Sequence, residues 1–427
     1  MTNLKEIKIK ELAEKYFEIN HPTGLKIIIC PMKNYTSSHA ILGTVYGSVN
    51  NCFGTLNGDL NTVPEGIAHF LEHKLFEDKS GRDTFELFSE TGADVNAFTS
   101  FEKTCYFFSG TSSFLKNLKI LLEFVNSPYF TEKTIEKEQD IIAQEIKMYN
   151  DDPDWQVFFN TLAAIYIKHP IRTDIAGTIQ SISKITKELL YTCYGTYYAP
   201  NNMILVATGN VEPESVVTCV NELYNSKEFK QISFENIMPE EPTNINKKII
   251  RKCLPVSIPL ITVGFKCKSG NKVENFTNKF KYDMLLKMLF GETSAFFKKC
   301  YETGLVTEPF ELQALSGNGF VSLLIGAKTI TPEKLYEGIL NEIGQKHVSG
   351  LNSDDFRCHK KDAFSSLVKT WEQPDALANV LFDLATVGLD FNSLFESISK
   401  LQINELEKLF KDNVEEEKSV LSVVSSS

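Results

Sequence analysis

The most informative stretch of the chain reads Thr62-Val-Pro-Glu-Gly-Ile-Ala-His69-Phe-Leu-Glu72-His73-Lys-Leu-Phe-Glu77. We expect it to form a helix on which His69 and His73, four residues apart, project from one face. Glu72 lies beside that face. Two neutral imidazoles and a carboxylate suit an open zinc site in which water takes the remaining position. A nearby carboxylate, here Glu72, would take a proton from that water and later return it to a leaving amine.

The motif H-x-x-E-H also arises by chance, so a solvated helix whose polar face holds these residues is the plain alternative. Only seven histidines occur in the chain, and two of them stand here at ligand spacing. A zinc site of this kind needs a third protein ligand. A predicted helix from Glu132 to Tyr149 offers Glu138 and Glu145, which are about two turns apart and share a face. Glu77 is a further contender, and spacing alone does not choose among the three carboxylates.

Strands and helices are predicted on both sides of the motif. The motif helix is expected to start with a capping box of Thr62 and Glu65, and Thr131 is expected to cap the helix that follows. Runs of apolar or alternating residues predict strands at Leu25–Cys30, Ala40–Tyr46, Val95–Thr99, Thr104–Ser109 and Met203–Gly209. Shorter helices are expected at Phe85–Glu90 and Glu214–Tyr224.

A change of composition divides the chain. Residues 226–246 are polar, contain two prolines and predict a linker. Residues 1–225 then form an N-terminal domain with the candidate zinc site. Residues 247–427 repeat the order strand, loop and helix, with a strand at Pro259–Cys267 and an apolar helix at Phe280–Phe290, but without a metal motif. We therefore expect an α+β protein of two homologous α/β halves, each a mainly antiparallel sheet backed by helices.

Composition excludes several classes of protein. The chain has 44 basic and 55 acidic residues, a formal net charge of -11, which is unlike the basic footprint of a nucleic-acid binder. Its nine cysteines are scattered without a C-x-x-C pair, which argues for a reducing compartment. The N-terminus lacks the apolar core of a signal peptide, and we see no apolar run of membrane-spanning length. We expect a cytoplasmic protein with no membrane or nucleic-acid partner.

The sequence HFLEH at 69–73 with E-x6-E at 138–145 resembles the pitrilysin/insulinase family of inverzincin zinc peptidases, in particular its short bacterial processing-peptidase-like subgroup. The resemblance extends over nearly the whole chain and is densest between Thr62 and Val211. Supporting segments are GADVNAFT at 92–99, IAGTIQSI at 175–182 and YAPNNMILV at 198–206. The resemblance implies that the two halves together form one half of a clamshell.

The resemblance also implies roles for particular residues. One Zn²⁺ per chain would be held by His69, His73 and Glu145, with Glu72 activating the water. Glu138 would orient a ligand imidazole.

A third implication of the resemblance concerns the substrate. In the family a peptide adds a strand to an exposed sheet edge beside the zinc, and the matching residues here are Asn96, Ala97 and Phe98. The alternative is an ordinary buried strand, since Val95, Ala97 and Thr99 share one face.

The second half departs from the family pattern. Active single-chain relatives carry an Arg and, seven residues later, a Tyr that polarises the scissile carbonyl. The matching positions here are Cys300 and Thr307, and Tyr301 is a weak substitute. Because such donors are worth about 3 kcal/mol each, we expect a paralogous subunit to supply the pair.

The favoured hypothesis is therefore a zinc metalloendopeptidase acting on small peptides or peptide precursors, as the catalytic subunit of a heterodimer. A non-catalytic binding or assembly subunit and a self-sufficient monomeric peptidase are the alternatives.

Overall fold

The computed structural model describes residues 4–55, 60–77, 79, 84–225, 229 and 231–426. The chain divides into two compact units, each assembled from three segments. Unit 1 comprises Met1–Ile146, Asp174–Ile237 and Leu367–Ser393. Unit 2 comprises Lys147–Thr173, Met238–Ser366 and Leu394–Ser427. The segments of the two units therefore alternate along the sequence.

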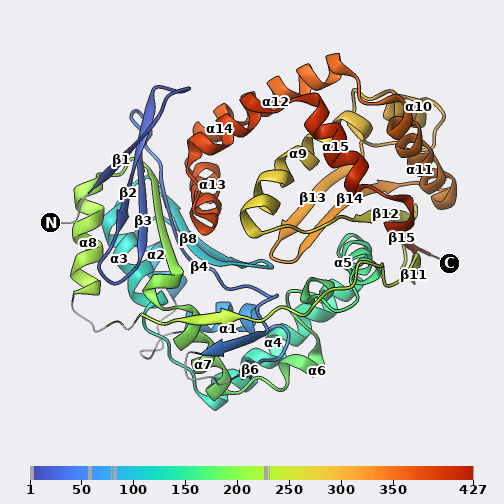
Figure 1. Ribbon diagram of the computed structural model, residues 1–427. Coiled ribbons are helices and arrows are strands. Elements are labelled where there is room, and N and C mark those ends of the chain that lie inside the picture. The colour runs from blue at the N-terminus through green and yellow to red at the C-terminus, as the bar shows by residue number, and fades with distance from the viewer. Residues whose placement is uncertain are drawn as a thin grey trace. The chain divides into compact units, whose positions relative to one another are not determined.

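Unit 1 is built on a seven-stranded sheet in the order β1-β2-β3-β9-β4-β8-β7 (Figure 1). The pair β3 and β9 is parallel, and the other pairs are antiparallel. The strands are β1 (Lys5–Ile9), β2 (Glu14–Asn20), β3 (Lys26–Pro31), β4 (Ser38–Thr44), β7 (Asp94–Thr99), β8 (Thr104–Gly110) and β9 (Met203–Gly209). Every residue of β9 is buried, which explains why its sequence is a continuous run of small and apolar residues.

Helices cover both faces of this sheet. On one face lie α3 (Phe114–Val125) and α8 (Pro213–Tyr224), and on the other lies α13 (Pro374–Val387), which contacts β4 and β9 (Figure 1). A Cβ atom on Gly43 of β4 would lie 2.5 Å from the ring of Phe382 on α13, so glycine is needed for so close an approach. The hydroxyl of Thr208 also donates to the carbonyl of Pro374 at 2.8 Å.

The remaining elements of unit 1 include the two helices of the candidate site, α1 and α4, and α4 continues into unit 2 after Ile146. They are α1 (Ile67–Leu75), α2 (Thr84–Ser89), α4 (Glu132–Asp151), α6 (Ile179–Ile182), α7 (Lys187–Tyr197), η2 (Pro200–Asn202) and a small sheet of β10 (Phe234–Asn236), β5 (Cys52–Thr55) and β6 (Leu60–Thr62). Helix α1 contacts β7, β8 and α7. Strand β10 belongs to the predicted linker, of which residues 226–228 and 230 lie outside the described residues.

Unit 2 contains a five-stranded sheet in the order β11-β15-β12-β14-β13. Its strands are β11 (Ile249–Cys253), β12 (Leu260–Lys266), β13 (Glu311–Gly317), β14 (Phe320–Lys328) and β15 (Ser419–Ser425), with β11 and β15 parallel and the other pairs antiparallel. Its helices are α5 (Pro153–Ile165), α9 (Lys272–Phe290), α10 (Ala295–Glu302), α11 (Pro332–Ser349), α12 (Ser353–Trp371), α14 (Phe391–Lys400), α15 (Ile403–Asn413) and the short η1 (Pro170–Arg172) and η3 (Glu416–Lys418), with the ends of α12 and α14 reaching into unit 1.

The two sheets repeat one design. Five strands of unit 1, β3-β9-β4-β8-β7, match β11-β15-β12-β14-β13 of unit 2 in order and direction. In unit 2, α5 packs on β12 and β15 as α13 packs on β4 and β9 in unit 1. A Cβ on Gly264 of β12 would lie 2.6 Å from the methyl group of Thr161 on α5, as Gly43 meets Phe382. The prediction of two homologous, mainly antiparallel α/β halves is therefore confirmed.

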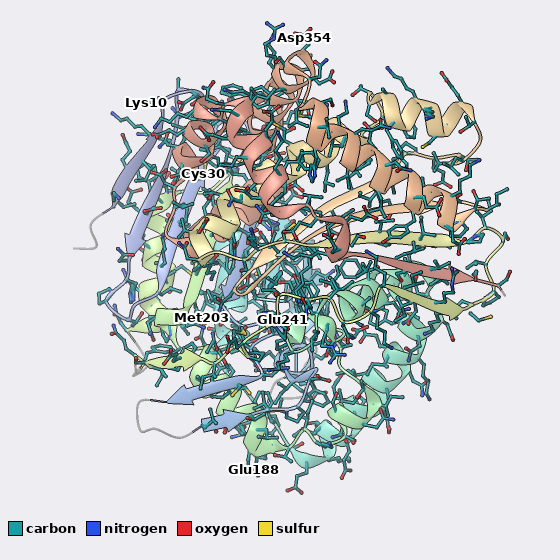
Figure 2. The ribbon with its side chains drawn as sticks, turned by 45° about the vertical axis from the view of Figure 1, so that its right-hand side comes forward. Lys10, Cys30, Glu188, Met203, Glu241 and Asp354 are labelled. Carbon is teal, nitrogen blue, oxygen red and sulfur yellow. The ribbon has the colours of Figure 1, made fainter. Side chains whose placement is uncertain are left out.

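A buried ion pair anchors the segment after β10 within unit 2. The carboxylate of Glu241, labelled in Figure 2, accepts hydrogen bonds from the backbone amides of Ile167, Lys168 and His169 at 2.7–2.9 Å. Lys266 donates to the same carboxylate at 2.5 Å. Part of the predicted linker is thus tied to the sheet of unit 2.

Two predicted helix starts are wrong. Thr62 belongs to strand β6, and α1 begins at Ile67 after Gly66, which has φ 89° and no side-chain cap. Backbone packing rather than a capping box therefore sets this start. Helix α9 begins at Lys272, capped by Asn271, and not at the predicted Phe280, because its first two turns are mostly polar and give only a weak apolar signal. The predicted cap at Thr131 is confirmed, since the amide of Thr134 donates to its hydroxyl at 3.3 Å.

Candidate metal centre

Two glycines fix where α1 begins. Gly66 and Gly177 both have positive φ, 89° and 75°, a conformation that favours glycine. A Cβ on Gly66 would lie 2.4 Å from the carbonyl oxygen of Ala176, and a Cβ on Gly177 would lie 2.5 Å from that of Glu65. The two chain segments therefore meet backbone to backbone, which sets the position from which α1 presents its polar residues.

Three potential metal ligands meet where α1 faces α4. The ligand atoms of His69, His73 and Glu145 all lie within 4.8 Å of one another. The Nε2 atoms of both histidines are 3.7 Å from oxygens of Glu145, and the two imidazole rings are 4.5 Å apart. His69 is buried, while His73 and Glu145 are partly exposed. Two imidazole nitrogens and a carboxylate around one open point form a donor set that suits zinc.

The three candidate carboxylates have different surroundings. Glu138 is buried and accepts a hydrogen bond from Nδ1 of His73 at 3.0 Å, which leaves Nε2 of that ring directed at Glu145. Glu77 pairs instead with Lys74 and is not part of the trio. The structure thus brings Glu145 to the two histidines, puts Glu138 behind one of them and leaves Glu77 apart.

The two histidines differ in the direction in which their surroundings shift the imidazole pKa. Burial, helped by the neighbouring His73, lowers the pKa of His69 to about 3, so its imidazole is neutral and able to bind a metal. Burial also acts to lower the pKa of His73, but the hydrogen bond to Glu138 and the charge of Glu72 outweigh it and leave that pKa raised.

Glu72 points to the end of the edge strand. Its side chain is buried, and burial raises its pKa despite a hydrogen bond from the hydroxyl of Thr99 at 2.6 Å. Thr99 is the last residue of β7, and its hydroxyl lies 3.3 Å from that of Thr104 on β8. From sequence alone we assigned Thr99 no role in orienting Glu72, although its place at the end of the predicted strand Val95–Thr99 was a usable signal.

The predicted substrate residues lie on an open edge. Strand β7 is the last strand of the seven-stranded sheet and pairs with β8 on one side. Val95 is buried, Asn96 is exposed, and Ala97 and Phe98 are partly exposed. The amide of Ala97 donates to the side-chain oxygen of Asn96 at 2.8 Å rather than to β8. This amide therefore faces the unpaired side of the strand.

The positions that depart from the family pattern lie in unit 2. Cys300, on α10, is buried in the apolar core of that unit, and burial raises the pKa of its thiol. Thr307 is exposed, and Tyr301 is 57% exposed. None of the three supplies a positive charge, so they do not replace an arginine.

Comparisons with known proteins agree with this picture. Residues 58–179 match the model of the insulinase family, peptidase family M16, and residues 184–362 match the model described as the peptidase M16 inactive domain. An uncharacterised zinc protease of Bacillus subtilis, YmfH, is 36% identical over 417 residues, which is 96% of each chain.

Solved structures show the same fold. A crystal structure from Alicyclobacillus acidocaldarius, described as M16-like, is 32% identical, has a TM-score of 0.92 and covers 99% of this chain and 98% of its own. A protease from Helicobacter pylori has a TM-score of 0.82 over the full length of both chains at 18% identity, which supports the fold alone. Among the described residues, none of the helices has the length and apolar character needed to cross a membrane.

Proposed function

Because this chain belongs to the insulinase family, peptidase family M16, we propose that it is a zinc metalloendopeptidase that hydrolyses small peptides or peptide precursors as the catalytic subunit of a heterodimer. The family and the names of its relatives indicate a zinc protease. The observation that carries the finer proposal is the meeting of His69, His73 and Glu145 within 4.8 Å, next to the buried Glu72.

The trio fits one zinc ion per chain. His69 is neutral and buried, and the Nδ1 bond of His73 to Glu138 leaves its Nε2 free for a metal. Zinc held by these residues would lower the pKa of a water molecule and polarise a peptide carbonyl. Glu145 adds the carboxylate that completes a three-residue ligand set.

Glu72 is the residue that moves the proton. Thr99 holds one of its carboxylate oxygens, Oε2, at 2.6 Å, so the other oxygen, Oε1, is the one that takes a proton from water. The same oxygen then donates that proton to the leaving amine. Because burial raises the pKa of Glu72, the carboxylate holds a proton more readily than an exposed glutamate would, as this double role requires.

An extended peptide would bind along β7. The amide of Ala97, which donates to the side chain of Asn96 in the structure, would instead donate to the main chain of a further strand. Pairing through the main chain selects for an extended conformation rather than for a sequence. Thr99, at the end of the same strand, holds Glu72, so a peptide on this edge would lie close to the base.

The partner is proposed from what unit 2 lacks. With Cys300 buried and Thr307 uncharged, this chain offers at these positions no donor of the Arg and Tyr type for the developing oxyanion. A paralogous subunit with that pair would complete the site. The alternative, a non-catalytic assembly subunit, is supported only by the match of residues 184–362 to the inactive domain. A scaffold has no need to keep His69, Glu72 and His73 together.

The test is cleavage of an internally quenched peptide library by the zinc-loaded chain, by its paralogue and by their mixture. We expect little activity alone and a gain of roughly a hundredfold on mixing, the cost of a missing oxyanion donor. A paralogue with its arginine changed to alanine is the control and should give no gain. Full activity from this chain alone would defeat the heterodimer, and no activity in the mixture would defeat the peptidase.

The cytoplasm is the proposed compartment. All nine cysteines are free thiols, and several are fully buried. Such cysteine usage is typical of proteins that fold in a reducing environment.

A further inference from the structure

Lys74 is a buried cation beside the candidate metal centre. It directly follows His73 on α1, and its side chain is 0% exposed. Its neighbours on the helix, Phe70, Leu71 and Leu75, are all buried and apolar. A lysine at such a position is costly, because taking an ammonium group out of water costs several kcal/mol that one ion pair rarely offsets.

The ammonium group of Lys74 has two partners. It forms a salt bridge with Glu77, one turn further along the chain, whose side chain is 32% exposed. It also donates to the backbone carbonyl of Thr134 at 3.4 Å. Thr134 lies in the first turn of α4, so Lys74 joins the end of one ligand-bearing helix to the start of the other.

Two adjacent residues of α1 therefore bind two residues one turn apart on α4. His73 binds Glu138, and Lys74 binds Thr134. Because α4 is a continuous helix from Glu132 to Asp151, fixing it at two points also fixes Glu145, which lies two turns beyond Glu138. With the Lys74 contact removed, α4 would be held to the metal site by the Glu138 bond and by its apolar face.

We infer that Lys74 is a positioning residue that holds α4 against α1, so that Glu145 stays in reach of both histidines. This inference rests on the proposed zinc peptidase function. It also explains why a costly buried lysine stands where an apolar residue would serve stability better, since replacing a buried ion pair by apolar residues is often neutral or stabilising.

The test uses two variants of the full chain, Lys74→Met and the double variant Lys74→Met/Glu77→Leu. Zinc affinity is measured by competition with a chelator, ligand geometry by the absorption spectrum of the Co²⁺-substituted protein, and stability by thermal unfolding of the metal-free protein. Peptide cleavage with the mixture described above gives kcat and KM. The matched control is Lys266→Met, which breaks the buried ion pair with Glu241 in unit 2.

In the double variant we expect unchanged or higher thermal stability together with zinc affinity and kcat each about tenfold lower, the usual cost of losing a residue that orients a ligand. The Co²⁺ spectrum should shift and KM should stay constant. Lys266→Met should lower stability and leave zinc affinity unchanged.

Two outcomes would overturn the inference, and they are distinguishable. Wild-type zinc affinity, spectrum and kcat in both Lys74 variants would show that the residue does not position the ligands. A wild-type chain that holds no zinc would remove the proposed function, and the role of Lys74 with it.

Discussion

Units 1 and 2 share a strand order, a parallel pair at the same position and a helix packed against a glycine, yet they differ in chemistry. In unit 1 two helices beside the sheet carry His69, His73 and Glu145. Among the described residues, unit 2 has no matching trio. Its corresponding helix, α9, buries apolar residues instead, among them Leu285 and Leu289. The architecture therefore does not require the proposed metal site, since only one of the two similar frameworks carries its residues.

The largest effect should come from removing a ligand in unit 1. His69→Ala or His73→Ala should abolish zinc binding and cleavage, because each removes a direct coordination bond. His359→Ala, on α12 of unit 2, is the matched control and should leave both intact. Elemental analysis of the purified proteins measures the zinc content. Equal zinc in the His69 and His359 variants would remove the contrast between the units.

Next in size is the difference between the two carboxylates of α4. Glu145→Gln should weaken zinc binding by roughly a hundredfold, since it removes a ligand, whereas Glu138→Gln should weaken it by about tenfold, since it only orients His73. Competition with a chelator gives both dissociation constants. The reverse order would exchange the roles of the two residues.

A smaller loss of stability, similar in the two units, should follow from replacing each of the two closely packed glycines by alanine. Gly43→Ala drives a methyl group into the ring of Phe382, and Gly264→Ala drives one into Thr161. Overpacking of this kind costs about 1–3 kcal/mol, so urea unfolding should show similar losses. Zinc bound per folded chain should be unchanged in Gly264→Ala. If Gly43→Ala lowered the free energy of unfolding and Gly264→Ala did not, the two helix–sheet contacts would not be equivalent.

A further predicted effect, which appears only in acid, concerns the stability of the fold. His39 of β4 stands four residues before Gly43, and the matching position before Gly264 is Leu260. Burial lowers the pKa of His39 to about 4, against the charge of Asp375, so the unfolded chain binds the extra proton between about pH 6.5 and 4. The contribution of His39 to the free energy of unfolding is then fully present above pH 6.5 and falls by roughly 3 kcal/mol as the pH drops to 4.

The change His39→Leu copies unit 2 and tests this directly. Urea unfolding of both proteins across that pH range should show less loss in the variant than in wild type. Parallel pH profiles for the two proteins would contradict the assignment.

Much of the fold could be predicted from sequence because the relevant signals are local. Apolar runs such as Met203–Gly209 predicted buried strands, and Thr131 predicted a helix cap. The spacing of His69 and His73 put two imidazoles on one face. The start of α1 escaped prediction because it depends on Gly177, which is distant in sequence.

Other parts of the site were also beyond local signals. Which carboxylate faces the histidines depends on how α4 lies against α1, and Glu138, Glu145 and Glu77 look alike in sequence. The role of Thr99 depends on its closeness to Glu72, and that of Lys74 on the end of α4. Helix α5 belongs to unit 2 although it precedes most of that unit in sequence, and α13 belongs to unit 1 although it follows most of that unit. Hydrophobic periodicity does not reveal which sheet a helix packs on.

The most direct test of the account is Glu72→Gln. The amide keeps the size of the side chain and still accepts the hydrogen bond from Thr99, but it cannot take a proton from water. Zinc content, thermal stability and peptide cleavage are measured together for the variant and the wild type in the presence of the paralogous subunit. The account predicts one zinc per chain and an unchanged fold, with cleavage reduced by at least a hundredfold. Cleavage near the wild-type rate in the zinc-loaded variant would contradict it.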